Sequence, residues 1–267
     1  MPVMGKLFSG QIVWITGASS GIGRALAVGF ARAGADVAVS ARRVERLAEV
    51  VSEIEHEGQR GLAVPCDVTD DGAVANAVQT TVAQLGGLDV AVANAGVGVS
   101  GRFESLTPEL WRRQFDVNVH GLISTARHAL PAVRERRGRL VFIGSVMGMM
   151  CAPENAPYCA SKFAVRAIGL SLAQELHGSG VSCTTIHPGF VESEIAQVDN
   201  EGIFHSDRDD TRPASLMWPA DRAARAMIRA IHRRKREYVF TGHGKVGAWL
   251  GRHMPGLVHF ALTRGNR

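Results

Sequence analysis

The sequence lacks any apolar run long enough to cross a membrane, which takes about 20 consecutive residues. The first apolar run, Ile12 to Ile15, is too short for the core of a signal peptide and leads straight into a glycine-rich loop. No linker, repeat or low-complexity stretch divides the 267 residues. We therefore expect one globular domain in the cytoplasm, attached at most to the surface of a membrane.

Cysteine is also scarce, and its spacing excludes the usual metal sites. No CxxC pair occurs, and no histidine stands near a cysteine at metal-ligand spacing. We expect free thiols in a reducing compartment and no bound metal. The carboxylates of Asp207, Asp209 and Asp210 are expected to solvate a mobile loop. The four cysteines are Cys66, Cys151, Cys159 and Cys183.

The positive charge is concentrated near the end of the chain. From Thr211 onward twelve Lys/Arg face two acids, so this part carries +10, and the first 210 residues carry −5 of the total of +5. Such asymmetry suits an acidic partner, a membrane surface or nucleic acid, or forms a solvated helix face. The basic run His232–Arg236 has no aromatic pattern or helix-turn-helix spacing beside it, so we expect no nucleic-acid binding.

Strand-like and helix-like segments alternate along the chain. This alternation predicts an α/β fold, a single doubly wound Rossmann-type domain whose seven-stranded parallel sheet has helices on both faces. Strands are expected at 11–16, 36–41, 61–66, 88–93, 139–143, 181–186 and 237–241. Helices are expected at 21–35, 43–57, 70–85, 107–136, 155–177 and 219–233, with a polar loop or lid at 192–213. In such folds ligands bind at the carboxyl ends of the strands.

The first strand ends in a glycine-rich loop, Thr16-Gly17-Ala18-Ser19-Ser20-Gly21-Ile22-Gly23. Its three glycines allow a tight turn and close approach of the backbone to a diphosphate. The helix that follows offers free N–H groups and the positive end of its dipole. A glycine loop in this position favours dinucleotide binding over simple helix–sheet packing.

Further motifs follow in order: Asn94-Ala95-Gly96, Asn118, Ser145, Tyr158-Cys-Ala-Ser-Lys162 and Pro188-Gly189. Together with the TGxxxGxG loop they resemble the short-chain dehydrogenase/reductase family, over roughly Lys6 to Thr241. The resemblance implies hydride transfer between a nicotinamide cofactor and a carbonyl or alcohol. It also implies a homodimer or homotetramer, paired through the long helices near Asn118 and Tyr158. The glycine spacing and the length disfavour the related sugar-nucleotide epimerases.

The catalytic residues implied by this resemblance are Asn118, Ser145, Tyr158 and Lys162. Residues four apart lie on one helix face, so Lys162 is expected to hold its ammonium beside the Tyr158 hydroxyl and to lower its pKa. Tyr158 would then act as general acid or base. Ser145 would donate to the carbonyl oxygen, and Asn118 would support a proton relay. A non-enzymatic regulator or scaffold of the same fold is the alternative, which these intact residues disfavour.

The end of the second strand indicates the cofactor. Arg42 stands where NAD-preferring relatives carry an acid, so NADP(H) is expected, with Arg43 in an assisting role. Ser193 replaces the usual threonine and keeps its hydroxyl. The cofactor residues implied are Gly17, Ser19, Ser20, Gly21, Ile22, Gly23, Arg42, Arg43, Asp67, Val68, Asn94, Ala95, Gly96, Tyr158, Lys162, Pro188, Gly189, Val191 and Ser193.

The sequence indicates the substrate less clearly than the cofactor. Apolar residues near the expected site favour an apolar ketone, aldehyde or alcohol, although the methionines also suit core packing. The candidates are Val97, Met147, Met149, Met150 and Phe190.

A C-terminal amphipathic extension, 242–267, follows the domain proper, 1–241. Its first stripe is Val246, Trp249, Leu250 and Met254, and Pro255-Gly256 ends that helix. A second apolar patch lies at 257–262, and the basic residues around both are Lys245, Arg252, Arg264 and Arg267. Packing on protein and contact with a membrane interface both stay open.

Overall fold

The computed structural model describes residues 6–264. It contains a seven-stranded sheet in the order β3-β2-β1-β4-β5-β6-β7, and every pair of neighbours is parallel. The strands are β1 Ile12–Thr16, β2 Asp36–Ser40, β3 Gly61–Ala63, β4 Val90–Ala93, β5 Arg139–Ile143, β6 Ser182–His187 and β7 Glu237–Val239. The predicted seven-stranded doubly wound sheet is therefore confirmed.

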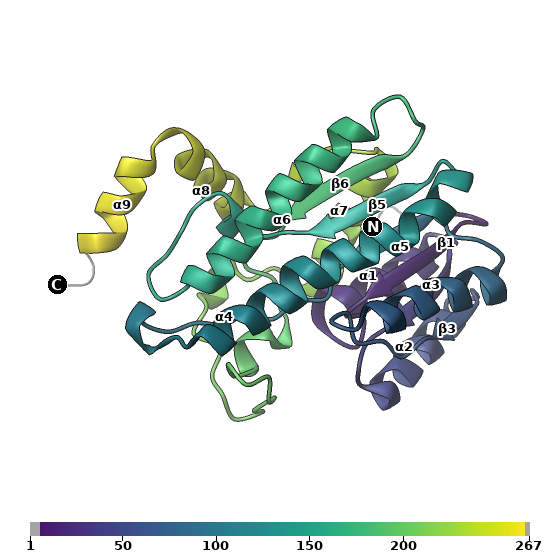
Figure 1. Cartoon of the computed structure of the whole chain (residues 1–267), viewed down its shortest axis with the longest axis horizontal. Coiled ribbons are helices and arrows are strands. Elements are labelled where there is room, and N and C mark those ends of the chain that lie inside the picture. The colour runs from purple at the N-terminus through teal and green to yellow at the C-terminus, as the bar shows by residue number, and fades with distance from the viewer. Residues whose placement is uncertain (1–5, 265–267) are drawn as a thin grey trace.

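Helices cover both faces of this sheet (Figure 1). They are α1 Gly21–Arg32, α2 Val44–His56, α3 Asp71–Leu85, α4 Pro108–Phe115, α5 Gly121–Glu135, α6 Ala156–Glu175, α7 Ala220–His232, α8 Gly242–His253 and α9 Pro255–Arg264. Helices α1, α2 and α7 share one buried apolar cluster with the sheet, and α3, α5 and α6 share the other. Strand β1 serves both clusters, because Val13 and Ile15 face one side while Ile12 and Trp14 face the other.

Most elements differ from the expected bounds by one to three residues at an end, and two differences have a clear local reason. The third strand ends at Ala63 rather than Cys66, because Pro65 has no N–H to donate. The backbone nitrogens of Val64 and Cys66 still donate to Val39 and Ala41, so the segment continues beside β2.

The expected helix 107–136 is one rod, but its middle turn, Asp116–His120, is a π-helix that links α4 to α5. The N–H of Gly121 reaches back five residues to the carbonyl of Asp116. Gly121 also packs against Val68, and a Cβ there would lie 2.7 Å from Cγ2 of that valine. The π-helix thus sets Asn118 beside the carboxyl end of β4.

The C-terminal extension forms two helices. Helix α8 ends at His253, Met254 leaves helical geometry, and Pro255 begins α9. Proline is well suited to the first position of a helix, because the N–H that it lacks would have no partner within the helix there. The break expected at Pro255 is confirmed, and the residue also starts a new helix. In Figure 1, which draws both helices in yellow, α8 lies against the body of the molecule and α9 projects away from it. Arg267 lies outside the described residues.

Candidate active site

A cavity of about 1030 Å³ opens at the carboxyl ends of the central strands. Its walls include the glycine loop after β1, the turns after β2, β3 and β4, and Ser145, Tyr158 and Lys162. The turn after β6 and the segment 194–204 complete it. Every residue named from the sequence as a cofactor contact lines this cavity. Within residues 6–264 no group of three or more His, Cys, Asp or Glu side chains is arranged to hold a metal ion.

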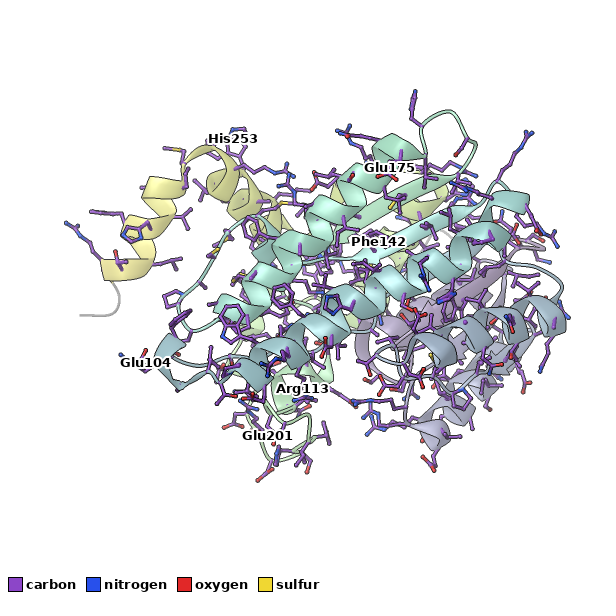
Figure 2. The ribbon with its side chains drawn as sticks, viewed as in Figure 1. Glu104, Arg113, Phe142, Glu175, Glu201 and His253 are labelled. Carbon is purple, nitrogen blue, oxygen red and sulfur yellow. The ribbon has the colours of Figure 1, made fainter. Side chains whose placement is uncertain are left out.

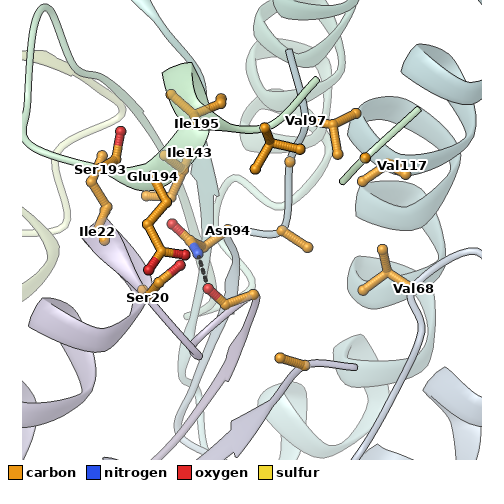
Figure 3. Close-up of a pocket in the computed structure, with 18 of the residues that line it drawn as sticks. Ser20, Ile22, Val68, Asn94, Val97, Val117, Ile143, Ser193, Glu194 and Ile195 are labelled. Carbon is orange, nitrogen blue, oxygen red and sulfur yellow. Dashed lines mark hydrogen bonds between the residues drawn. The ribbon is translucent and has the colours of Figure 1, made fainter. Parts of the chain in front are cut away.

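The glycine loop is packed so tightly that side chains are excluded. Gly17 has φ +65°, and a Cβ there would lie 2.6 Å from Cα of Ala95. A Cβ at Gly23 would lie 2.3 Å from the carbonyl oxygen of Gly17. Asn94 holds the loop from β4, since its Nδ2 donates to the carbonyls of Thr16 and Gly17 at 2.9 and 3.0 Å. Figure 3 shows Asn94 with a dashed line for one hydrogen bond from its side-chain nitrogen. The loop is therefore a rigid cradle of backbone groups.

Arginines surround the outer end of the cavity. Arg42 is exposed, and it lies close enough to Arg113 of α4 to contribute to lowering its pKa, although burial contributes more. Arg43 donates to the hydroxyls of Ser19 and Ser20 at 3.0 Å each. The site thus presents several guanidinium groups to an anion without an acid at the end of β2.

Glu194 lines the cavity, although no sequence motif indicated it as a site residue. Its carboxylate pairs with Arg43 at 3.0 Å and also with Arg46, although the arginines lie about 150 positions away. Figure 3 shows the Glu194 side chain directed toward Ser20 of the glycine loop. On the other side, Arg113 binds the carbonyl of Asn200 (Figure 2 labels Arg113 and the nearby Glu201). The predicted loop 192–213 is therefore tied across the cavity from α2 and α4.

Three of the four residues that the motifs imply as catalytic, Ser145, Tyr158 and Lys162, line the cavity, whereas Asn118 is buried and is not among the lining residues. Ser145 follows β5, and its Oγ accepts from the backbone N–H of Met147 at 3.1 Å. Tyr158 and Lys162 lie on one face of α6, with the lysine Nζ 5.8 Å from the centre of the tyrosine ring. Lys162 is buried and donates to the carbonyl of Ile143 at 3.0 Å. The four-residue spacing places tyrosine and lysine side by side, as expected.

The lowered pKa expected for Tyr158 is not what the folded chain gives. Burial raises the pKa of Tyr158, and hydrogen bonding with Ser145 opposes that rise only in part. Burial also lowers the pKa of the Lys162 ammonium to about 8. Desolvation disfavours the charged form of both groups.

Asn118 belongs to a buried amide network. Its Oδ1 accepts from the N–H of Val97 at 2.8 Å, and its Nδ2 donates to the carbonyl of Val97 and to Ser161 Oγ. Gln114, one turn earlier, donates to the same two acceptors. This network holds the turn after β4 against α6. Gln114 was missed, although its i, i+4 spacing to Asn118 is a signal for a shared helix face.

A second missed pair lies beneath Ser145. His187, the last residue of β6, is fully buried and donates from Nδ1 to the carbonyl of Ser145 at 3.0 Å. Its Nε2 lies 3.1 Å from Glu237 Oε1 of β7, without the geometry of an ordinary hydrogen bond. Burial opposes ionisation of Glu237, yet His187, Arg166 and Arg252 hold its pKa far below the usual range. These contacts fix the backbone that carries Ser145.

The other predicted residues are placed as follows. Asp67 accepts hydrogen bonds from the backbone N–H and the hydroxyl of Thr69. The Ser193 hydroxyl oxygen accepts a hydrogen bond from the Arg212 guanidinium at 3.4 Å. Of the proposed substrate contacts, Val97 lines the cavity, whereas Met149 is buried and Met147 and Met150 are half-buried behind Ser145. Phe190 stacks on His243 of α8. Contact of these four with substrate stays a prediction; Ile195, Val198 and Phe204 are apolar lining residues that the sequence did not indicate.

Comparison with known proteins agrees with this geometry. Residues 11–203 match the family described as short chain dehydrogenase. A 3beta-hydroxysteroid dehydrogenase from Mediterraneibacter gnavus is 35% identical over 202 residues, which cover 75% of this chain and 73% of that protein.

Two solved structures share the fold. A short chain dehydrogenase from Burkholderia cenocepacia in complex with NADP has a TM-score of 0.79 at 28% identity, covering 89% of this chain and 99% of that one. A short chain dehydrogenase/reductase from Burkholderia phymatum in complex with NAD also has a TM-score of 0.79, at 26% identity, covering 87% and 89%. The family uses a nicotinamide cofactor, and this chain belongs to it: it is a short-chain dehydrogenase of the oxidoreductase class.

Proposed function

We propose that this enzyme is an NADP(H)-dependent oxidoreductase that interconverts a carbonyl and a secondary alcohol on an apolar substrate. The observation that carries the proposal is the meeting of Ser145, Tyr158 and Lys162 on the wall of one cavity with the glycine cradle. A proton donor, a hydrogen-bond donor and a nucleotide-binding loop are the parts this reaction needs.

The residues present fit an NADP(H) cofactor. The tight backbone turn at Gly17 and Gly23 leaves room only for a ligand that approaches main-chain N–H groups. Arg42, with Arg113 nearby, suits a 2′-phosphate, and Asp67 with Val68 borders the expected adenine position. When bound, the nicotinamide supplies or accepts the hydride.

The protein's own groups manage the proton and the developing charge. In the reductive direction the Tyr158 hydroxyl gives its proton to the carbonyl oxygen. Ser145 Oγ already accepts from Met147 N, so its O–H is available to donate to the same oxygen. The Lys162 ammonium stabilises the negative charge that then appears on Tyr158. Asn118 holds the turn at Val97 in place.

The lining of the cavity supports an apolar substrate. Val97, Ile195, Val198 and Phe204 line it beside the reactive groups. The similarity to a 3beta-hydroxysteroid dehydrogenase supports a bulky alicyclic alcohol or ketone of that kind. We also propose a homodimer or homotetramer through α5 and α6, which expose Ile123 and Phe163.

A panel of ketones, aldehydes and secondary alcohols, assayed by NADPH absorbance with the purified chain, tests the function. We expect turnover to be fastest with bulky apolar alicyclic compounds and slow with sugars. Binding of NADPH without turnover of any carbonyl or alcohol would instead support a non-enzymatic role.

The pH dependence of the reductive reaction follows from Lys162. Because its pKa is lowered to about 8, the free enzyme loses the ammonium as pH rises through that value. The raised pKa of Tyr158 keeps its hydroxyl protonated over the same range. We expect kcat/KM for carbonyl reduction to fall above pH 8, by about tenfold per pH unit.

Steady-state assays from about pH 6 to about pH 10 measure this decline. Thermal melts over the same range serve as the control, since they separate titration from unfolding. A profile that stays flat well beyond pH 9 in a folded enzyme would refute the role given to Lys162.

A further inference from the structure

The C-terminal hairpin, α8 and α9 at residues 242–264, contains no acidic residue. No Asp or Glu occurs anywhere after Glu237. Its cations are Lys245, Arg252 and Arg264, together with three histidines. Arg252 pairs with Glu237 at 2.6 Å, whereas Lys245 and Arg264 form no ion pair with any residue in 6–264. The hairpin therefore carries a net positive charge.

Helix α8 is attached to the body through its small residues, not through its apolar stripe. A Cβ at Gly251 would lie 2.2 Å from the carbonyl oxygen of Met149, and one at Gly244 3.0 Å from Val146. Buried Ala248 lies between these two glycines on the helix. The glycines let the helix backbone approach the segment after Ser145, and the large side chains therefore point elsewhere.

The large apolar side chains of the hairpin are exposed. Val246, Trp249, Leu257 and Phe260 keep 60%, 55%, 48% and 50% of their surface exposed. None of the ten residues of α9 is buried. An isolated helix shorter than about 12 residues is marginal in water, so α9 needs a further surface to lie on. Figure 1 shows α9 projecting away from the sheet, and Figure 2 shows the side chains of this hairpin spread around it.

The positive charge of the hairpin favours an anionic lipid surface over the hairpin of a second copy as its binding partner. Pairing with the hairpin of a second copy would bring Lys245 and Arg264 of both copies together, and like charges repel. An anionic lipid surface instead offers phosphates to the cations and an apolar boundary to the aromatic rings. No helix in residues 6–264 is both long and apolar enough to cross a bilayer.

We propose that the C-terminal hairpin docks this enzyme on the surface of an anionic membrane, lying in the plane of the interface. Trp249 and Phe260 enter the boundary between headgroups and acyl chains. Arg264 lies over the Phe260 ring at 4.1 Å, so its stem follows the ring while its guanidinium reaches the phosphates. The proposal depends on neither the cofactor nor the substrate.

Flotation of the full-length protein with phosphatidylcholine vesicles containing about one-third phosphatidylserine tests it. We expect the wild type to float with these vesicles, with pure phosphatidylcholine vesicles far less, and less again at high salt. The double variant Lys245→Glu with Arg264→Glu should weaken vesicle binding by about 30-fold or more. Each cation lost near the surface costs about fivefold in affinity, and the two factors multiply. Trp249→Ser with Phe260→Ser should weaken it by at least about tenfold.

Phe103→Ser is the matched control, because it removes an exposed phenyl ring outside the hairpin and should leave flotation unchanged. Enzymatic activity and thermal melts of each variant verify folding. Absence of flotation of the wild type, or equal flotation of the hairpin variants, would overturn the proposal. So would a drop in sedimentation coefficient in the Trp249/Phe260 variant without lipid, since that result would identify a second copy as the occupant.

Discussion

Replacing Tyr158 with phenylalanine is expected to lower kcat/KM by about 10²–10⁴-fold, because the substitution removes a positioned proton donor. The phenyl ring keeps the packing on α6 and leaves Lys162 and the glycine cradle in place. Binding of NADPH should therefore change little. Steady-state kinetics on a confirmed substrate and a fluorescence titration with NADPH measure the two effects separately.

Tyr238→Phe is the matched control. The chain has two tyrosines, and Tyr238 lies in β7, outside the cavity lining. This variant should behave like the wild type in both assays. If the Tyr158 variant retained most of its kcat/KM, the general acid would have to be sought elsewhere, with Ser145 as the next candidate.

The second large effect concerns cofactor choice. Arg42→Ala should weaken binding of NADPH by about ten- to a hundredfold, the value of one charge-assisted hydrogen bond to a phosphate. NADH lacks that phosphate, so its affinity should hardly change. Arg42 is exposed at the cavity edge, and its removal leaves no buried partner unsatisfied. Calorimetric or fluorescence titration of both cofactors, on wild type and variant, gives the ratio directly.

Arg229→Ala controls for the loss of one positive charge, because Arg229 is exposed on α7 and does not line the cavity. Equal or tighter binding of NADH than NADPH by the wild type would contradict the preference for NADP(H). Unchanged NADPH affinity in Arg42→Ala would shift the assignment to Arg43 or Arg113.

Lys162 and Glu237 illustrate how the surroundings in the folded chain, rather than neighbours in sequence, decide whether a side chain is charged: burial dominates at Lys162, and charged partners outweigh burial at Glu237. The Tyr158–Lys162 spacing predicted a lowered tyrosine pKa, whereas desolvation raises it. Glu237 looks like an ordinary surface acid in the sequence. In the fold it lies among His187, Arg166 and Arg252, from β6, α6 and α8, and its pKa is held far below its usual range.

The order of strands and helices, the parallel sheet, the glycine cradle and the Tyr158–Lys162 pair could all be predicted from the amino-acid sequence. These features depend on residues within one or two turns of each other, where period and turn chemistry are readable directly. Ser145 lines the same cavity as that pair, as its place after a strand suggested, because the carboxyl ends of parallel strands lie at one edge of the sheet.

Contacts between residues far apart in the sequence could be identified only in the folded chain. Glu194 reaches Arg43 over about 150 positions, and His187 reaches the Ser145 carbonyl over 42. In the tail, the apolar stripe of Val246 and Trp249 marked a helix, yet α8 packs through Gly244 and Gly251. The physical reason is the same in each case. Local pattern fixes which face a helix can bury, but close approach of backbones and the loss of water depend on what the rest of the chain brings against it.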